Sequence, residues 1–144
     1  MSKGNTFEND LMKLIFNATA IANLADNAAA SPLTSLYLSL HTGDPGEAGD
    51  QTTSEATYTS YARVAVTRNS GGWTVSANQA SNAALVQFPQ CTGGTNTISY
   101  VGIGTTGGTS AGKLLYSGQL SSSLAVSNLI QPQFAIGALV ASED

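Results

Sequence analysis

The chain has 144 residues, a mass of 14.7 kDa and a formal net charge of −4. This length suits one domain with its own core, and five Lys and Arg residues cannot form the basic surface that nucleic-acid phosphates require. No run of about 18 apolar residues is present, so no membrane-spanning helix is expected. The sequence therefore predicts neither a nucleic-acid partner nor a membrane partner.

Charge is scarce along most of the chain. Charged residues make up 10% of the sequence, whereas an average soluble domain has about 25%. Between Asn69 and Ser142 the only charged residue is Lys113. Such a surface is poorly protected against association, so we expect much of it to be buried against other copies or partners. The single Cys91 and an N-terminus without an apolar leader predict synthesis in, and retention by, a cytoplasm.

The first predicted element is an amphipathic helix over Thr6–Ala25. Asn5 and Glu8 have the spacing of a capping box, and apolar residues follow at helical intervals. The helix either caps a sheet of its own chain or reaches a neighbouring subunit, as terminal elements of symmetric assemblies often do. In both cases its apolar stripe is expected to be buried, and its candidate assembly contacts are Phe7, Leu11 and Ile15.

A strand is predicted from Ser35 to His41. Leu36, Leu38 and Leu40 alternate with polar residues, which is typical of a half-buried strand with the leucines facing the core. His41 is then the polar end of this strand. Thr42–Gly46 contains Pro and Gly and ends it.

The long acidic loop at residues 43–60 follows. It contains four of the nine acidic residues, but their spacing fits no EF-hand, and we predict no metal site. Arg63, which follows the loop, is suited to pair with one of its carboxylates and pin the loop down. The candidate assembly contacts of the loop are Asp44, Glu47, Asp50, Glu55 and Tyr58.

The sequence after the acidic loop is typical of short strands separated by glycine-rich turns. The predicted strands are Tyr61–Arg68, Trp73–Ser76, Ala83–Phe88, Thr97–Ile103, Lys113–Ser117, Leu124–Leu129 and Phe134–Val140. Strands without intervening helices predict a mainly β fold, an antiparallel β-sandwich or jelly-roll-like barrel with an N-terminal α-helix. The predicted organisation is an N-terminal helical arm at 1–30 and one β-sandwich domain at 33–144.

Two glycine-rich stretches match parts of nucleotide-binding motifs, but neither match is complete. Gly102–Gly107 matches G-x-G-x-x-G and Gly107–Lys113 matches part of a P-loop, but no helix is expected after the first and Leu114 replaces the required Ser or Thr after the second. His41 is the only histidine, and no nucleophile elbow accompanies it. The sequence therefore predicts no enzyme, no catalytic residues and no cofactor.

The run LYLSLHTGDPGEAGDQTTSEATYTSYARVAV at Leu36–Val66 resembles a family of small virion proteins of tailed bacteriophages, often labelled tail fibre proteins. The resemblance extends over nearly the whole chain. It includes Ser54–Ala56, Tyr61–Val64, Gly72–Trp73, Phe88–Pro89 and Phe134–Leu139. It implies a structural component of a phage particle, located in the virion and made in the host cytoplasm, with no catalytic residues to carry over.

Three functions are compatible with these features. The preferred one is a capsid decoration or cement protein on the capsid surface, because the chain has no repeat or shaft sequence of the kind a long fibre needs. It would form a homotrimer and contact other virion proteins such as the major capsid protein. The alternatives are a tail-fibre or tail-tip structural protein and a surface carbohydrate-binding module, although Trp73 after Gly71–Gly72 is better explained as a core anchor than as a sugar platform.

Overall fold

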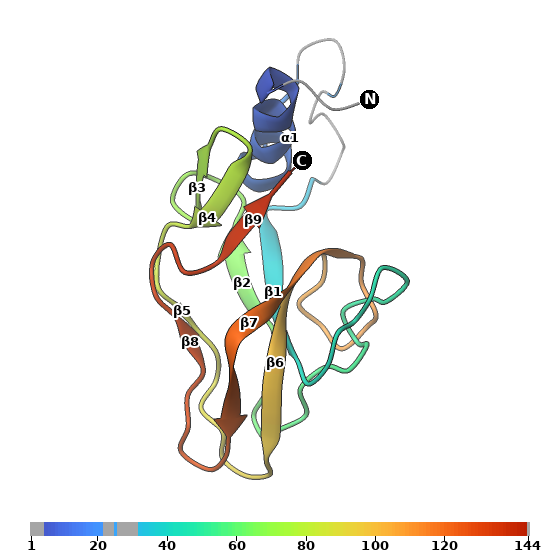
Figure 1. The fold of residues 1–144 in the computed structure, drawn as a ribbon, viewed down its shortest axis with the longest axis vertical. Helices are drawn as coiled ribbons and strands as arrows, with labels where there is room; N and C mark the ends of the chain where they lie inside the picture. Colours follow the sequence, from blue (N-terminus) through green and yellow to red (C-terminus); the bar gives the residue numbers. More distant parts are fainter. Residues whose placement is uncertain (1–4, 22–24, 26–31, 144) are drawn as a thin grey trace. The chain divides into compact units, whose positions relative to one another are not determined.

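The computed structural model describes residues 5–21, 25 and 32–143. Within these residues one helix, α1 (Asn5–Asn17), precedes nine strands (Figure 1). The strands are β1 (Ser35–His41), β2 (Val64–Thr67), β3 (Trp73–Ser76), β4 (Gln79–Asn82), β5 (Val86–Gln87), β6 (Asn96–Gly104), β7 (Leu114–Val126), β8 (Gln133–Phe134) and β9 (Val140–Ser142).

The strands form three sheets in the described part of the chain. Their orders are β2-β1-β6-β7, β3-β4-β9 and β5-β8. The pairs β1–β6, β6–β7, β3–β4 and β4–β9 are all antiparallel. The prediction of a mainly antiparallel β fold with an N-terminal helix is therefore confirmed, and the sheets are open, not closed into a barrel.

The chain groups into two compact units. The first unit comprises Met1–Ser35, Val66–Val86 and Phe134–Asp144, and contains α1, β3, β4 and β9. The second unit comprises Leu36–Ala65 and Gln87–Gln133, and contains β6, β7 and all of β1 except Ser35. The first unit is thus built from three segments of the chain and the second from two, so neither unit is a continuous segment of sequence.

Helix α1 supplies part of the core of the first unit. It packs against β3 and β4. Met12 and Phe16 are fully buried, and the Phe16 ring meets the Trp73 ring edge-on with centroids 4.7 Å apart. Trp73 is itself fully buried, which confirms the prediction of a core anchor. Helix α1 therefore covers the sheet of its own unit, while Phe7 stays 39% exposed.

The predicted helix over Thr6–Ala25 was too long, because the structure ends α1 at Asn17. Ala18 has a φ of 53°, the left-handed conformation that often follows a helix C-terminus. The Arg68 side chain then caps the helix, donating from Nε to the Ile15 carbonyl oxygen at 2.6 Å. The predicted helix continues through Ala18, but a cap supplied from a distant segment ends α1 at Asn17; residues 22–24 of the predicted helix lie outside the described residues.

Strand β1 is buried on both faces, not on one as its alternation predicts. Leu36, Leu38 and Leu40 are 2%, 0% and 1% exposed, which confirms that they face a core. Ser39 and His41 on the opposite face are also 0% exposed. The prediction of a half-buried strand was therefore wrong, because a neighbouring loop covers the polar face.

Several other strand boundaries differ from the prediction. The structure has one long β7 where two strands were expected. It also places β4 in a segment predicted as a turn, since the inward-facing residues of β4 are Ala80 and Asn82, which give little hydrophobic signal. Asn82 instead donates to the carbonyl oxygens of Ala84 and Ala135 and accepts from the Leu139 amide.

Candidate functional site

The acidic loop, residues 43–60, covers the polar face of β1 and is anchored by Gln51. The Gln51 side chain is 0% exposed, donates to the Thr106 carbonyl oxygen at 3.2 Å and accepts from the Thr106 amide at 3.0 Å. It fits there because Gly104 and Gly112 have no side chains, and a Cβ atom at either position would overlap it. The loop is thus locked to the glycine-rich turn at residues 105–112.

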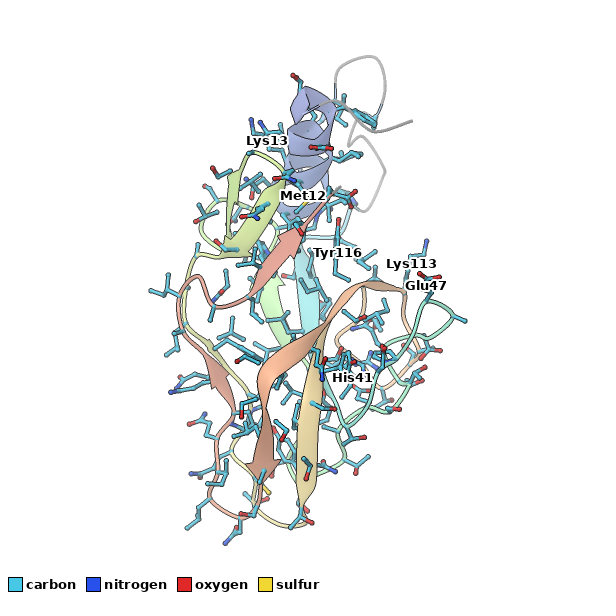
Figure 2. All side chains as sticks on the ribbon, in the orientation of Figure 1. Met12, Lys13, His41, Glu47, Lys113 and Tyr116 are labelled. Atoms are coloured by element: carbon cyan, nitrogen blue, oxygen red, sulfur yellow. The ribbon has the colours of Figure 1, made fainter. Side chains whose placement is uncertain are left out.

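Beneath the loop, His41 is held between a hydroxyl and a carbonyl group. Its Nδ1 lies 2.8 Å from the Thr53 carbonyl oxygen and its Nε2 lies 2.9 Å from Ser39 Oγ. Because the carbonyl oxygen only accepts, Nδ1 carries the proton and the Ser39 hydroxyl donates to Nε2. Burial lowers the pKa of His41 below its usual value, so the imidazole is neutral at neutral pH. Figure 2 labels His41 in the second unit.

The Ser39–His41 pair has a nucleophile and a base within hydrogen-bond distance, but it is closed to substrate. Both side chains are 0% exposed, and the third partner is the Thr53 carbonyl group instead of a carboxylate. The pair therefore fixes the loop to the strand in this structure.

A buried ion pair joins the C-terminal part of the acidic loop to Arg63, which follows the loop. Arg63 Nε donates to Glu55 Oε1 at 2.7 Å and Nη2 to Oε2 at 2.8 Å. Arg63 Nη1 also donates to the carbonyl oxygens of Thr106 and Ser110. The hydroxyl of Tyr61 donates to Glu55 Oε1, and burial raises the pKa of this hydroxyl well above its usual value. The predicted pairing of Arg63 with a loop carboxylate is confirmed.

Where the loop leaves the sheet, a shallow groove of about 480 Å³ remains. We call it the β7 groove. Its lining combines the tip of the acidic loop with one residue of β6 and six consecutive residues of the edge strand β7. The lining residues are Asp44, Gly46, Glu47, Gly49, Tyr100, Leu114, Leu115, Tyr116, Ser117, Gly118 and Gln119.

The strand register explains why this face is covered at β1 and open at β7. His41 pairs with Tyr100 and Tyr100 with Gln119, so these three side chains share one face of the sheet. Exposure rises along the row, because His41 is fully buried, Tyr100 is half-buried and Gln119 is exposed. The groove is therefore the uncovered end of a face that the loop otherwise closes.

The predicted assembly residues are divided among different environments. Of the loop residues, Asp44 and Glu47 line the groove, whereas Glu55 is committed to the internal ion pair. Asp50 accepts from the amide and hydroxyl of Thr52, and these hydrogen bonds lower the pKa of its carboxyl group.

The other predicted assembly residues are not among the residues that line the groove. Tyr58 is buried and donates to the Pro89 carbonyl oxygen, and burial raises its pKa to about 12. Leu11 and Ile15 on α1 are half-buried, and together with Phe7 they belong to the first unit.

Sequence reasoning missed the groove residues on the strands. Tyr100, Ser117 and Gln119 belong to no recognisable sequence motif. They line the groove together with the acidic loop only because the sheet register places them on the same face. Tyr100 and Ser117 lie within predicted strands, whereas Gln119 falls between two of them, so the sequence offered no signal for it. Among the described residues, no group of three His, Cys, Asp or Glu side chains is placed to hold a metal ion.

The edge strand β7 is the most unusual surface feature. It is 13 residues long, lies at the end of its sheet and contains no charged residue and no proline. Its pairing with β6 breaks between Leu124 and Gln119, so residues 120–123 form a wide bulge. In the same unit Leu124, Leu129 and Ile130 are 36%, 69% and 39% exposed.

Comparison with known proteins identifies the family. The family model described as Podophage GP4 fiber I protein gp80 matches residues 3–142, and the chain belongs to this family. It is therefore a phage virion structural protein, as its resemblance implied. A comparison with curated proteins finds no match. In the described residues there is no helix of the length and hydrophobicity that a membrane span needs.

Proposed function

We propose that this protein is a non-enzymatic structural subunit of a fibre on the phage particle, and that it assembles through β7 of its second unit. The observation that carries the proposal is the uncharged edge strand β7, considered together with the description of the family as a fiber protein. Neither half of the proposal needs a reaction, a cofactor or a metal.

Edge strands of monomeric proteins normally carry features that prevent pairing with other chains. Lysine, proline and inward-pointing charge are the common ones, since an exposed edge offers unpaired amide and carbonyl groups. β7 has none of these three features from Leu114 to Val126, and its pairing with β6 is irregular at two places, residues 120–123 and Leu115. A strand of this kind is suited to be covered by another chain in the assembled particle.

The exposed apolar side chains support the same conclusion. Leu129 is 69% exposed and has a φ of 72°, a conformation that is unfavourable for a bulky side chain. It is held there by hydrogen bonds from its amide to Cys91 and from the Gln90 side chain to its carbonyl group. A strained, exposed leucine fixed in place is better explained by a contact with another chain than by packing within this one.

We further propose that the partner is another copy of the same chain in a closed trimer, which then contacts other virion proteins. Closed rings bury equivalent surfaces on every subunit and leave no free ends. A capsid decoration protein remains a second candidate, because the sequence has no repeat that would build a long shaft. If the protein is part of a fibre, the absence of a repeat favours a short segment that attaches the fibre over a long shaft.

Electron cryomicroscopy of intact particles tests the location. A few copies confined to the tail or a fibre support the proposal, whereas hundreds of copies over the head surface would establish the decoration role instead.

The assembly surface is tested by comparing Ala125→Lys with Thr57→Lys. Both positions are exposed in the second unit, but only Ala125 lies on β7. We expect Ala125→Lys to reduce trimer formation in light scattering and incorporation into particles, because a lysine protects a strand edge. Thr57→Lys should leave both unchanged. Normal assembly of the Ala125→Lys variant would remove β7 from the interface.

A further inference from the structure

We propose that the β7 groove binds a saccharide, and that it prefers an amine-bearing sugar to a neutral one and rejects an acidic one. This site goes beyond the assembly role, because the groove lies on the face of the sheet that carries Tyr100 and Gln119, whereas assembly is proposed to use the free hydrogen-bonding edge of β7. Its volume of about 480 Å³ lies within the range of roughly 300–1,000 Å³ typical of small-molecule sites.

The chemistry of the lining suits a polyhydroxylated ring. Tyr100, Ser117 and Gln119 provide hydroxyl and amide groups on one wall, and Asp44 and Glu47 provide carboxylates on the other. Hydroxyl groups of a sugar both donate and accept, so they can bond to all of these groups. Apolar surface from the leucines of β7 completes the lining and is suited to the carbon-bound hydrogens of a sugar ring.

The charges in the groove determine which sugars fit. The lining contains two carboxylates and no basic residue, and the whole chain has a net charge of −4. Figure 2 labels Lys113 close to Glu47 in this view, but Lys113 is not among the lining residues. A protonated amine gains a charge-assisted hydrogen bond here, whereas a uronic acid or phosphate is repelled.

The acidic wall is also held in a defined position. The amide of Gly46 donates to Asp44 Oδ1 at 2.9 Å, which orients this carboxylate. Behind it, Gln51 and the Arg63–Glu55 pair fix the loop to the glycine-rich turn. A wall that is already ordered loses little freedom when a ligand binds, which favours measurable affinity even in a shallow groove.

The test is a titration of the full chain monitored by amide chemical shifts in NMR. The probes are a fully deacetylated glucosamine trimer, maltotriose and a galacturonic acid trimer, at a pH where the amine is protonated. We expect shifts at residues 44–49 and 114–119, with affinity decreasing from the glucosamine trimer to maltotriose and no response to the galacturonic acid trimer.

Variants separate the groove from the remainder of the surface. Ser117→Trp fills the groove and should weaken binding of the glucosamine trimer at least about tenfold. Ser122→Trp is its control, because Ser122 is exposed on the same strand but outside the lining. Glu47→Gln should weaken the glucosamine trimer more than maltotriose, since it removes charge and keeps the shape. If Ser117→Trp fails to fold, Gln119→Trp replaces it.

Three results would overturn the proposal. The first is the absence of shifts with both the glucosamine trimer and maltotriose at millimolar concentration. The second is equal or tighter binding of the galacturonic acid trimer. The third is a response at residues 114–119 to a lysine-rich peptide but to no saccharide, which would assign the groove to an extended polypeptide. None of these results bears on the fibre location, which particle imaging decides separately.

Discussion

The most informative perturbation of this fold is the removal of Arg63. Its guanidinium group makes two hydrogen bonds to Glu55 and one each to the carbonyl oxygens of Thr106 and Ser110. The two side chains of the ion pair are 2% and 14% exposed. Arg63→Met keeps the aliphatic length of the side chain but leaves the Glu55 carboxylate with the Tyr61 hydroxyl as its remaining partner among these groups.

Breaking a buried ion pair by removing one partner costs about 3–5 kcal/mol of unfolding free energy, because the other charge stays buried. Glu55 retains some exposure, so we expect the lower end, about 3 kcal/mol. For a chain of this length, such a loss lowers the melting temperature by about 10 °C. Arg63→Met with Glu55→Leu should recover part of the loss, since the double variant buries no unpaired charge.

The measurement is urea denaturation followed by circular dichroism, combined with hydrogen exchange. Tryptophan fluorescence is unsuitable, because Trp73 lies in the first unit and the ion pair lies in the second. We expect faster exchange at residues 44–60 and 105–112, the two segments that Arg63 joins.

Arg68→Met is the matched control. Arg68 also donates to carbonyl oxygens, those of Leu14, Ile15 and Leu33, but no carboxylate is among these partners. Its replacement therefore leaves no buried charge unpaired and should lower the free energy of unfolding by only about 1 kcal/mol. A loss below about 1 kcal/mol for Arg63→Met, or unchanged exchange in the two loops, would refute the view that this pair holds the loop.

The remaining predictions concern the two faces of β1 and the loop above it. Leu38→Asp should give no soluble folded protein, because a buried unpaired charge costs as much as the whole stability of a domain, roughly 5–15 kcal/mol; a folded variant in circular dichroism would show that the strand faces are misassigned. Gly104→Ala should lower the free energy of unfolding by about 1–3 kcal/mol, because the added Cβ overlaps Gln51. In the same denaturation assay Gly108→Ala should change it by less than about 0.5 kcal/mol, because a Cβ at this position contacts no other atom. The free energy of unfolding should fall as the pH drops below 6.5, the ordinary pKa of a histidine side chain. The pKa of His41 is lower than this in the folded protein, so the unfolded chain takes up the proton first. This acid-dependent part should be absent from His41→Gln, and an unchanged pH profile would exclude His41 as its source.

Much of the fold follows from local sequence patterns. The bounds of β1 and β3 match their predictions, because alternation and flanking glycine or proline are local signals. The pairing of Arg63 with a loop carboxylate was also predictable, since few charges are available in this chain.

Only the tertiary structure decided what covers each face. Alternation shows that Ser39 and His41 share a face, but not that the acidic loop buries it, because that depends on Gln51 fitting over two distant glycines. Likewise, Asp44 and Gln119 meet in one groove because the β1–β6–β7 register aligns segments far apart in sequence. The sequence by itself determined strand faces, scarce charge and family, whereas the groove arose from long-range pairing, which no local period encodes.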